Sequence, residues 1–167
     1  MLFRSFIDVS SEPGRGTTFK IYLPRHGDAE GASQTHPASD KAPRGKETIL
    51  LTEDEPAVLA LTAKQLDALG YTVLEARTPD AALRISEQYP GEVDLLITDV
   101  IMPDMNGRDL SRQLSSGRPR IKNLFMSGYT ADVIAHHGVL EEGVHFIQKP
   151  FSATDLAVKV RKVLDSD

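Results

Sequence analysis

Residues 94–99 read Asp-Leu-Leu-Ile-Thr-Asp, a short run that is largely apolar on both faces of a strand. A strand with two apolar faces is typical of a parallel sheet covered by helices on both sides. Ligands of such sheets bind beyond the carboxyl ends of the strands. Asp99 stands at such an end, before a loop that contains proline and glycine. This segment predicts a reactive carboxylate at the edge of a sheet, although a turn or helix cap would also explain the Asp.

Strand-like and helix-like segments alternate from residue 47 onward. Five strands separated by helices require right-handed crossovers. The pattern therefore predicts a doubly wound, five-stranded parallel sheet of flavodoxin-like order 2-1-3-4-5 in three α/β/α layers. We expect strands at residues 48–52, 71–75, 95–98, 123–126 and 144–147, and helices at 56–70 and 78–88 and from about residues 106, 130 and 152.

The first expected helix illustrates how the helices would cover this sheet. Its apolar residues recur with the spacing of an amphipathic helix, which indicates packing against the sheet rather than a functional role. The residues expected on the buried face are Val58, Leu59, Leu61, Leu66 and Leu69.

Length and composition limit the organisation of the chain. Its 167 residues suffice for one complete domain with some length left over. Residues 26–46 offer few side chains that could be buried, so they are expected to form a flexible linker. This linker separates a short piece, residues 1–25, from a domain of residues 47–167.

Several classes of function are disfavoured by the composition. A net charge of −5 and a pI near 5.5 argue against nucleic-acid binding. The absence of cysteine excludes disulfides and thiolate chemistry. No apolar stretch approaches the roughly 20 residues that span a bilayer, and the first residues do not form a signal sequence. The adjacent His136 and His137 are expected on a solvated helix face rather than in a metal site.

Reactive side chains follow four of the five expected strands. Glu53 and Asp54 come after the first strand, Asp99 after the third, Ser127 after the fourth and Lys149 after the fifth. These strand ends share one edge of a parallel sheet, so the side chains are expected to meet there.

Three carboxylates that meet at one edge call for a cation. They would repel one another by about 4 kcal/mol per pair at an effective dielectric constant near 20. Hard oxygen ligands with room for water suit Mg²⁺ better than Zn²⁺. If Asp99 acts as a nucleophile toward a phosphoryl group, the product is an acyl phosphate. Mg²⁺, Lys149 and Ser127 would then neutralise the phosphoryl oxygens.

Four motifs carry a resemblance to a known family. They read Leu-Leu-Thr-Glu-Asp-Glu-Pro at residues 50–56, Ile-Thr-Asp-Val-Ile-Met-Pro-Asp-Met-Asn-Gly at 97–107, Phe-Met-Ser-Gly-Tyr at 125–129 and Phe-Ile-Gln-Lys-Pro-Phe at 146–151. With these motifs, residues 47–167 closely resemble the receiver domain of two-component response regulators. The resemblance covers about three quarters of the chain.

The resemblance implies a specific role for each residue of the acidic edge. Asp99 would be phosphorylated from a phosphohistidine. Glu53 and Asp54 would bind Mg²⁺ together with Asp99 and the backbone carbonyl of Ile101. Lys149 would contact the phosphate.

The resemblance also implies a conformational switch. Ser127 would move toward the new phosphate and Phe146 would turn inward, while the Lys149–Pro150 peptide would be cis. Two positions depart from the commoner pattern, because Glu53 stands where Asp is more frequent and Ser127 where Thr is more frequent. Both look like tolerated variants.

The N-terminal piece resembles part of another module. Residues 6–24 alternate like two strands around a glycine-rich turn and look like the final hairpin of a histidine-kinase ATPase domain. An unrelated hairpin or a disordered tail is the alternative. The kinase resemblance implies that the parent protein is a hybrid sensor histidine kinase. The partner of this chain would be a kinase core or a histidine phosphotransfer protein, and the chain would lie in the cytoplasm. The segments that would bind ATP are missing, so the chain itself would support only phosphorylation and dephosphorylation of Asp99.

Three other functions compete with this interpretation. A stand-alone response regulator is the main alternative. A haloacid-dehalogenase-type phosphatase would also use an Asp nucleophile and Mg²⁺, but such enzymes resemble one another in a second Asp two residues later, where this chain has Ile101. An interaction domain with an inactive site is disfavoured by the complete set of reactive residues.

Overall fold

The computed structural model describes residues 6–22, 43–128 and 145–166. The chain divides into two compact units, Met1–Ser39 and Asp40–Asp167, which we describe separately. The helix expected from residue 130, with His136 and His137, lies outside the described residues, as does Val144 at the start of the last expected strand.

The first unit contains an antiparallel hairpin of β1 (Phe6–Glu12) and β2 (Gly16–Tyr22). Gly14 and Gly16 in its turn have φ values of 77° and 87°, which glycine adopts more readily than other residues. An ion pair between Arg15 and Glu12 closes the turn at 3.1 Å. The sequence pattern of two strands around a glycine-rich turn is therefore present in the structure.

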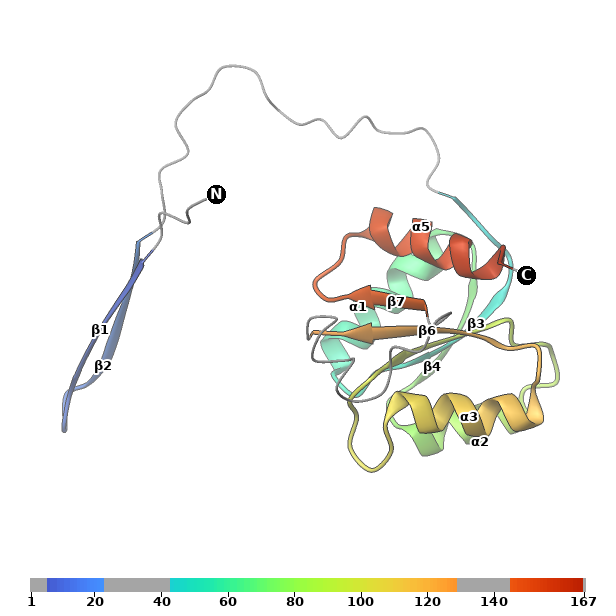
Figure 1. The fold of residues 1–167 in the computed structure, drawn as a ribbon, viewed down its shortest axis with the longest axis horizontal. Coiled ribbons are helices and arrows are strands. Elements are labelled where there is room, and N and C mark those ends of the chain that lie inside the picture. Colours follow the sequence, from blue (N-terminus) through green and yellow to red (C-terminus); the bar gives the residue numbers. More distant parts are fainter. Residues whose placement is uncertain (1–5, 23–42, 129–144, 167) are drawn as a thin grey trace, which may run out of the picture. The chain divides into compact units, whose positions relative to one another are not determined.

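The second unit is built on a five-stranded parallel sheet (Figure 1). Its strand order is β4-β3-β5-β6-β7, with every neighbouring pair parallel. This is the order 2-1-3-4-5 expected from the sequence, so the flavodoxin-like fold is confirmed. The strands are β3 (Thr48–Thr52), β4 (Thr72–Ala76), β5 (Leu95–Asp99), β6 (Lys122–Ser127) and β7 (His145–Gln148).

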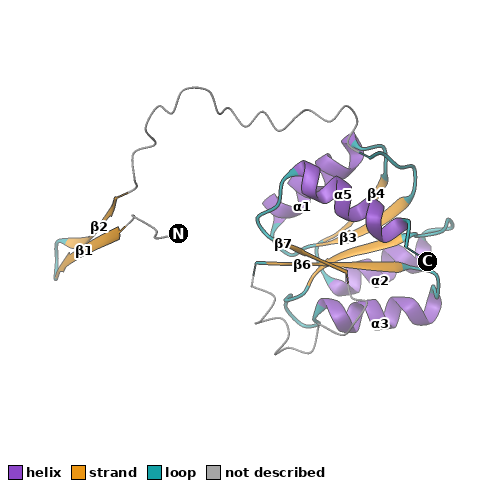
Figure 2. Cartoon of the chain, turned by 45° about the horizontal axis from the view of Figure 1, so that its top comes forward, coloured by secondary structure: helices purple, strands orange, loops and turns teal. Residues whose placement is uncertain are grey.

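Helices cover both faces of this sheet (Figure 2). On one face α1 (Pro56–Ala68) and α5 (Ala153–Leu164) pack on a core that includes Ile49, Leu51 and Ile97. On the other face α2 (Pro79–Gln88) and α3 (Gly107–Gly117) pack on a core that includes Leu50 and Leu96. Successive residues of β3 and β5 thus enter opposite cores, which explains why these strands are apolar throughout.

Side-chain caps set the starts of three helices. Thr78 accepts a hydrogen bond from the N–H of Ala81 at the start of α2, at 3.2 Å. Asn106 caps α3 in the same way. Ser152 begins α5 with a capping box, in which the carboxylate of Asp155 accepts from the backbone N–H of Ser152 at 3.0 Å. Such caps satisfy N–H groups that have no partner inside the helix.

The expected buried face of α1 is wrong at one position. Leu59 and Leu66 are buried, but Leu61 is 59% exposed and Val58 is half-buried. Two residues along a helix turn by roughly 200°, so Leu61 cannot share the face of Leu59. Thr62 and Ala63 take its place in the core.

No helix in the described part of the chain is both long enough and apolar enough to span a membrane.

Candidate functional site

The register of the sheet brings the reactive strand ends to one level. Thr52 of β3 pairs with Thr98 of β5, so Glu53 and Asp99 follow at the same height on adjacent strands. Hydrogen bonds hold the loops beyond the strand ends. The N–H of Val100 donates to the carbonyl of Met126 at 2.9 Å, and the N–H of Lys149 donates to the carbonyl of Ser127 at 2.7 Å.

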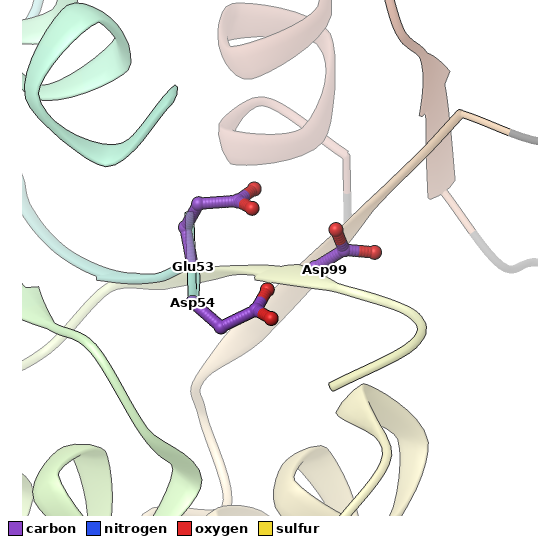
Figure 3. Close-up of side chains that lie close together, drawn as sticks. All are labelled: Glu53, Asp54 and Asp99. Atoms are coloured by element: carbon purple, nitrogen blue, oxygen red, sulfur yellow. The ribbon is translucent and has the colours of Figure 1, made fainter. Parts of the chain in front are cut away.

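Three carboxylates converge at this edge (Figure 3). Oxygen atoms of Glu53, Asp54 and Asp99 all lie within 4.8 Å of one another. Glu53 is only 2% exposed, Asp99 is partly buried and Asp54 is exposed. The cluster therefore has a buried side toward the sheet and an open side toward solvent.

Lys149 is the counterion of the two inner acids. Its Nζ atom lies 2.5 Å from Oε2 of Glu53 and 2.6 Å from Oδ2 of Asp99. Burial acts to lower the pKa of Lys149, but its bonds to Asp99 and Glu53 outweigh that effect and raise the pKa above its ordinary value. Lys149 is therefore protonated at neutral pH. Burial raises the pKa of Glu53, although the bond to Lys149 acts in the opposite direction.

The charge and chemistry of the cluster fit a small divalent cation. The three carboxylates carry −3 when ionised and Lys149 carries +1, which leaves −2 at the edge of the sheet. Carboxylate oxygens are the ligands that Mg²⁺ prefers, and Mg²⁺ usually keeps several waters. The open side beyond Asp54 leaves room for those waters and for an incoming oxygen. The residues present therefore suit Mg²⁺.

The other predicted residues lie on the neighbouring strands and loops of the same sheet. Ser127 is 1% exposed at the end of β6. Phe146 is half-buried and packs against Val100 and Phe125. Ile101 donates its backbone N–H to Oδ1 of Asp99 at 3.1 Å, which fixes the rotamer of that carboxylate. The Lys149–Pro150 peptide is cis, as the resemblance implies.

Comparison with known proteins identifies the second unit. The family description "Response regulator receiver domain" matches residues 49–161. The chain belongs to the receiver family. A solved receiver domain, that of the hybrid histidine kinase CckA, matches with 39% sequence identity and a TM-score of 0.60. That match covers 71% of this chain and 99% of the solved chain, so it has the length of the receiver alone.

Curated sensor kinases match over more of the chain. The sensor kinase CckA of Brucella abortus (strain 2308) is 41% identical over 167 residues, which is 96% of this chain and 18% of the relative. The aerobic respiration control sensor protein ArcB of Escherichia coli (strain K12) is 32% identical over 96% of this chain and 20% of the relative. This chain thus spans about a fifth of these kinases. Receivers related to it form parts of hybrid sensor kinases.

A free-standing relative gives a shorter match. The response regulator receiver protein CpdR of Brucella abortus (strain 2308) is 29% identical over 116 residues, which is 70% of this chain and 95% of the relative. The matches to CckA and ArcB each cover 96% of this chain, so they must include residues of the N-terminal hairpin, β1 and β2. The match to CpdR has the length of the receiver alone.

The structure of this receiver gives Gly107 a role that the sequence analysis did not assign. A Cβ atom at Gly107 would lie 2.1 Å from the carbonyl oxygen of Asp99 and 2.9 Å from Cγ2 of Thr98. The first turn of α3 therefore lies directly against the backbone of Asp99. The only signal in the sequence is an Asn-Gly pair before an amphipathic helix, which indicates a cap and a turn but not this close approach.

An apolar groove of about 500 Å³ opens beside the acidic cluster of the receiver. Its lining includes Val58 and Leu61 of α1 together with Lys149, Pro150 and Phe151. The exposed Leu61, which the sequence analysis placed in the core, thus belongs to a surface that borders the site. Lys149 is common to both features.

Proposed function

We propose that this receiver takes a phosphoryl group from a phosphohistidine onto Asp99 and changes conformation or passes the group to a histidine phosphotransfer protein. This proposal rests on one observation: carboxylate oxygen atoms of Glu53, Asp54 and Asp99 lie within 4.8 Å of one another, and Lys149 forms an ion pair with Asp99. Glu53, Asp54, Asp99 and the carbonyl of Ile101 would hold Mg²⁺. Bound there, Mg²⁺ supplies positive charge to the transferring phosphoryl oxygens.

The transfer breaks one bond and forms another. An Oδ atom of Asp99 attacks the phosphorus, the P–N bond to the donor imidazole breaks, and its electron pair stays on the imidazole nitrogen, which takes up a proton. The product is an acyl phosphate on Asp99. The Nζ atom of Lys149 lies 2.6 Å from Oδ2 of Asp99, so after the transfer it can bind a negatively charged phosphoryl oxygen instead.

Ser127 and Phe146 are proposed as the switch. Ser127 is buried at the strand end next to Asp99, where its hydroxyl can donate to a phosphoryl oxygen. Phe146 contacts Val100, the residue that follows Asp99. A shift of Ser127 toward the phosphate would leave space into which Phe146 can move.

The parent protein is proposed to be a hybrid sensor histidine kinase. The matches to CckA and ArcB include the N-terminal hairpin, whereas the match to the free-standing CpdR has the length of the receiver. We accordingly assign residues 1–25 to the end of a kinase ATPase domain, 26–46 to a linker and 47–167 to the receiver. A cytoplasmic location of this chain follows from the same assignment.

The groove on α1 supports a protein as phosphoryl donor. It joins apolar side chains to Lys149, so a helix that carries the phosphohistidine could lie on Leu61 and Phe151 while its imidazole faces Asp99. Leu61→Glu is expected to slow transfer from a phosphorylated protein donor about tenfold, which corresponds to roughly 1.4 kcal/mol, and to leave phosphorylation by acetyl phosphate unchanged. Val158→Glu, at a 54% exposed position on α5, is the matched control.

Acetyl phosphate tests the phosphoacceptor directly. The intact chain incubated with Mg²⁺ and acetyl phosphate is expected to gain the mass of one phosphoryl group, and EDTA is expected to prevent the gain. Asp99→Asn should abolish the adduct, while Asp104→Asn, at an exposed acid of the following loop, should keep it. An adduct that survives Asp99→Asn, or no adduct in the unaltered chain, would reject the proposal.

A further inference from the structure

Asn106 and Gly107 stand where the loop that follows Asp99 enters α3. Asn106 is exposed, whereas Gly107 is buried. In an Asn-Gly pair the backbone nitrogen of the glycine can attack the amide carbon of the asparagine side chain, because glycine has no Cβ atom to hinder the approach. The pair therefore has the chemistry of spontaneous deamidation, a reaction that the proposed transfer to Asp99 does not involve.

Deamidation of this pair proceeds in two steps that need only water. The nitrogen of Gly107 forms a bond to Cγ of Asn106, the bond from Cγ to Nδ2 breaks, and ammonia leaves with the proton of the Gly107 nitrogen. Water then opens the five-membered imide ring. Attack of water at Cγ gives aspartate. Attack at the main-chain carbonyl carbon gives isoaspartate, in which the main chain runs through Cβ and Cγ.

The folded loop restrains both reacting groups. Oδ1 of Asn106 accepts the N–H of Asp109 at 2.9 Å, and Nδ2 of Asn106 donates to Oδ2 of Asp109 at 2.9 Å. The N–H of Gly107 donates to the carbonyl of Val100 at 3.0 Å. The backbone of Asn106 is extended, with a ψ of 159°, and must rotate before the ring can close. The reaction therefore requires a local opening of the loop and the first turn of α3.

The position of the pair gives its two products different consequences. A Cβ atom at Gly107 would lie 2.1 Å from the carbonyl oxygen of Asp99, so the first turn of α3 has no spare room there. Isoaspartate adds one carbon atom to the main chain just before Gly107, so α3 cannot keep both its cap and its contact with Asp99. Aspartate adds no main-chain atom, and its carboxylate can still accept the N–H of Asp109.

We propose that Asn106 is a deamidation site that the folded receiver keeps closed, and that isoaspartate at position 106 breaks the contact between α3 and Asp99. Deamidation occurs when the first turn of α3 opens. The consequence for phosphoryl acceptance by Asp99 rests on the function proposed above, whereas the protection of the site and the loss of the contact do not.

The rate of deamidation tests the protection. The intact chain is incubated near neutral pH, folded and in urea, and peptide mapping by mass spectrometry measures the modified fraction at Asn106. We expect the reaction to be about 100-fold slower in the folded chain. Asp109→Ala removes the acceptor of Nδ2 and should speed the reaction of the folded chain about fivefold. Asp155→Ala removes the acid at the same position of α5 and should leave the rate unchanged.

Two results of this experiment would overturn the inference. Equal rates in the folded and unfolded chains would show that the loop does not restrain the pair. An equal acceleration by Asp109→Ala and Asp155→Ala would place the reaction in the globally unfolded chain, because these two variants share only the loss of a helix-capping acid.

The products test the structural consequence. Chain aged in urea is refolded, the isoaspartate form is separated, and protein isoaspartate methyltransferase confirms the modification. Amide hydrogen exchange in α3 is expected to be about 100-fold faster in the isoaspartate form than in Asn106→Asp, which carries the same charge on an ordinary main chain. Equal exchange in the two forms would reject the proposed loss of contact.

The phosphoacceptor function is measured on the same samples. With acetyl phosphate and Mg²⁺, Asn106→Asp is expected to gain the adduct on Asp99 and the isoaspartate form is expected to lack it. An adduct in neither of these forms nor in the unaltered chain would reject the phosphoacceptor, while the rates and the exchange still decide the deamidation site. An adduct of equal yield in all three forms would keep the phosphoacceptor and reject the damage by isoaspartate.

Discussion

The Nζ atom of Lys149 lies 2.6 Å from Oδ2 of Asp99, although fifty positions separate the two residues in the chain. The same ammonium also bonds to Glu53, so one cation serves two of the three acids. Asp54, the third acid, is the most exposed of the cluster. The charge that Lys149 leaves uncompensated is the physical reason to expect a divalent cation at this edge.

Asp54→Asn is expected to reduce stabilisation of the receiver by Mg²⁺. A ligand that binds only the folded state raises the free energy of unfolding according to its affinity. Loss of one carboxylate ligand should weaken binding about tenfold, which lowers the Mg²⁺-dependent gain by roughly 1.4 kcal/mol at saturating metal. Urea denaturation with Mg²⁺ and with EDTA measures that gain. Asp67→Asn, at an exposed acid of α1, should keep the gain of the unaltered chain, and equal gains in both variants would argue against the site.

Gly107→Ala is expected to destabilise the receiver by about 2 kcal/mol, because the added Cβ overlaps the carbonyl oxygen of Asp99. Gly117→Ala is the matched control at the other end of α3, where a Cβ meets no atom within 4 Å. That change should be neutral or stabilise by up to about 1 kcal/mol. Chemical denaturation of both variants compares them, and equal stabilities would refute the close approach of α3 to Asp99.

Arg118→Met is expected to lower the free energy of unfolding by about 3 kcal/mol. The Arg118 guanidinium donates to the hydroxyl and carbonyl of Ser86 and to the carbonyls of Tyr89 and Gly91, at 2.5 to 2.9 Å. Removal of the side chain leaves these acceptors, in the last turn of α2 and just beyond it, without that donor. Arg118→Lys should restore little, because an ammonium lacks the planar fork.

The neighbouring Arg120 is the control for Arg118. Its side chain is 87% exposed and pairs with an exposed Glu92. Arg120→Met should therefore change the free energy of unfolding by less than about 1 kcal/mol. Thermal or urea denaturation that ranks the two variants in the reverse order would contradict this assignment.

His145 is expected to make the receiver less stable in mild acid. Burial lowers the pKa of His145 below 6.5, and Lys159, Lys162 and Lys122 lower it further. In mild acid the unfolded chain therefore binds a proton at His145 more readily than the folded chain does. The contribution of neutral His145 to the free energy of unfolding is complete above pH 6.5 and is lost as the pH falls toward the lower pKa of the folded state. The stability difference between the unaltered chain and His145→Asn should therefore shrink on acidification. Urea titrations across this range measure it, and a difference that grows would reverse the assigned sign.

The strand order and the position of the acidic cluster follow from local sequence features. Residues that are apolar on both faces mark β3 and β5, and the caps Thr78, Asn106 and Ser152 mark helix starts. Once the strands are parallel, their carboxyl ends must share an edge. The meeting of Glu53, Asp54 and Asp99 could therefore be predicted without coordinates.

Other features depend on tertiary packing and could not be predicted in this way. Leu61 belongs to the groove and not to the core, which the leucine pattern of α1 does not distinguish. Arg118 and Arg120 lie two residues apart and look alike in the sequence, yet one binds three backbone carbonyls and the other faces solvent. Which arginine is structural is decided by the end of α2, a separate segment of the chain.

The central claim is that Asp99 accepts the phosphoryl group. Its most direct test is reduction of the phosphorylated chain with borohydride, which converts an aspartyl phosphate to homoserine, followed by peptide mass mapping. We predict homoserine at position 99 after treatment with acetyl phosphate and Mg²⁺, and none there when EDTA replaces Mg²⁺. Homoserine at another acid, or modification of Asp99 that is independent of Mg²⁺, would contradict the account.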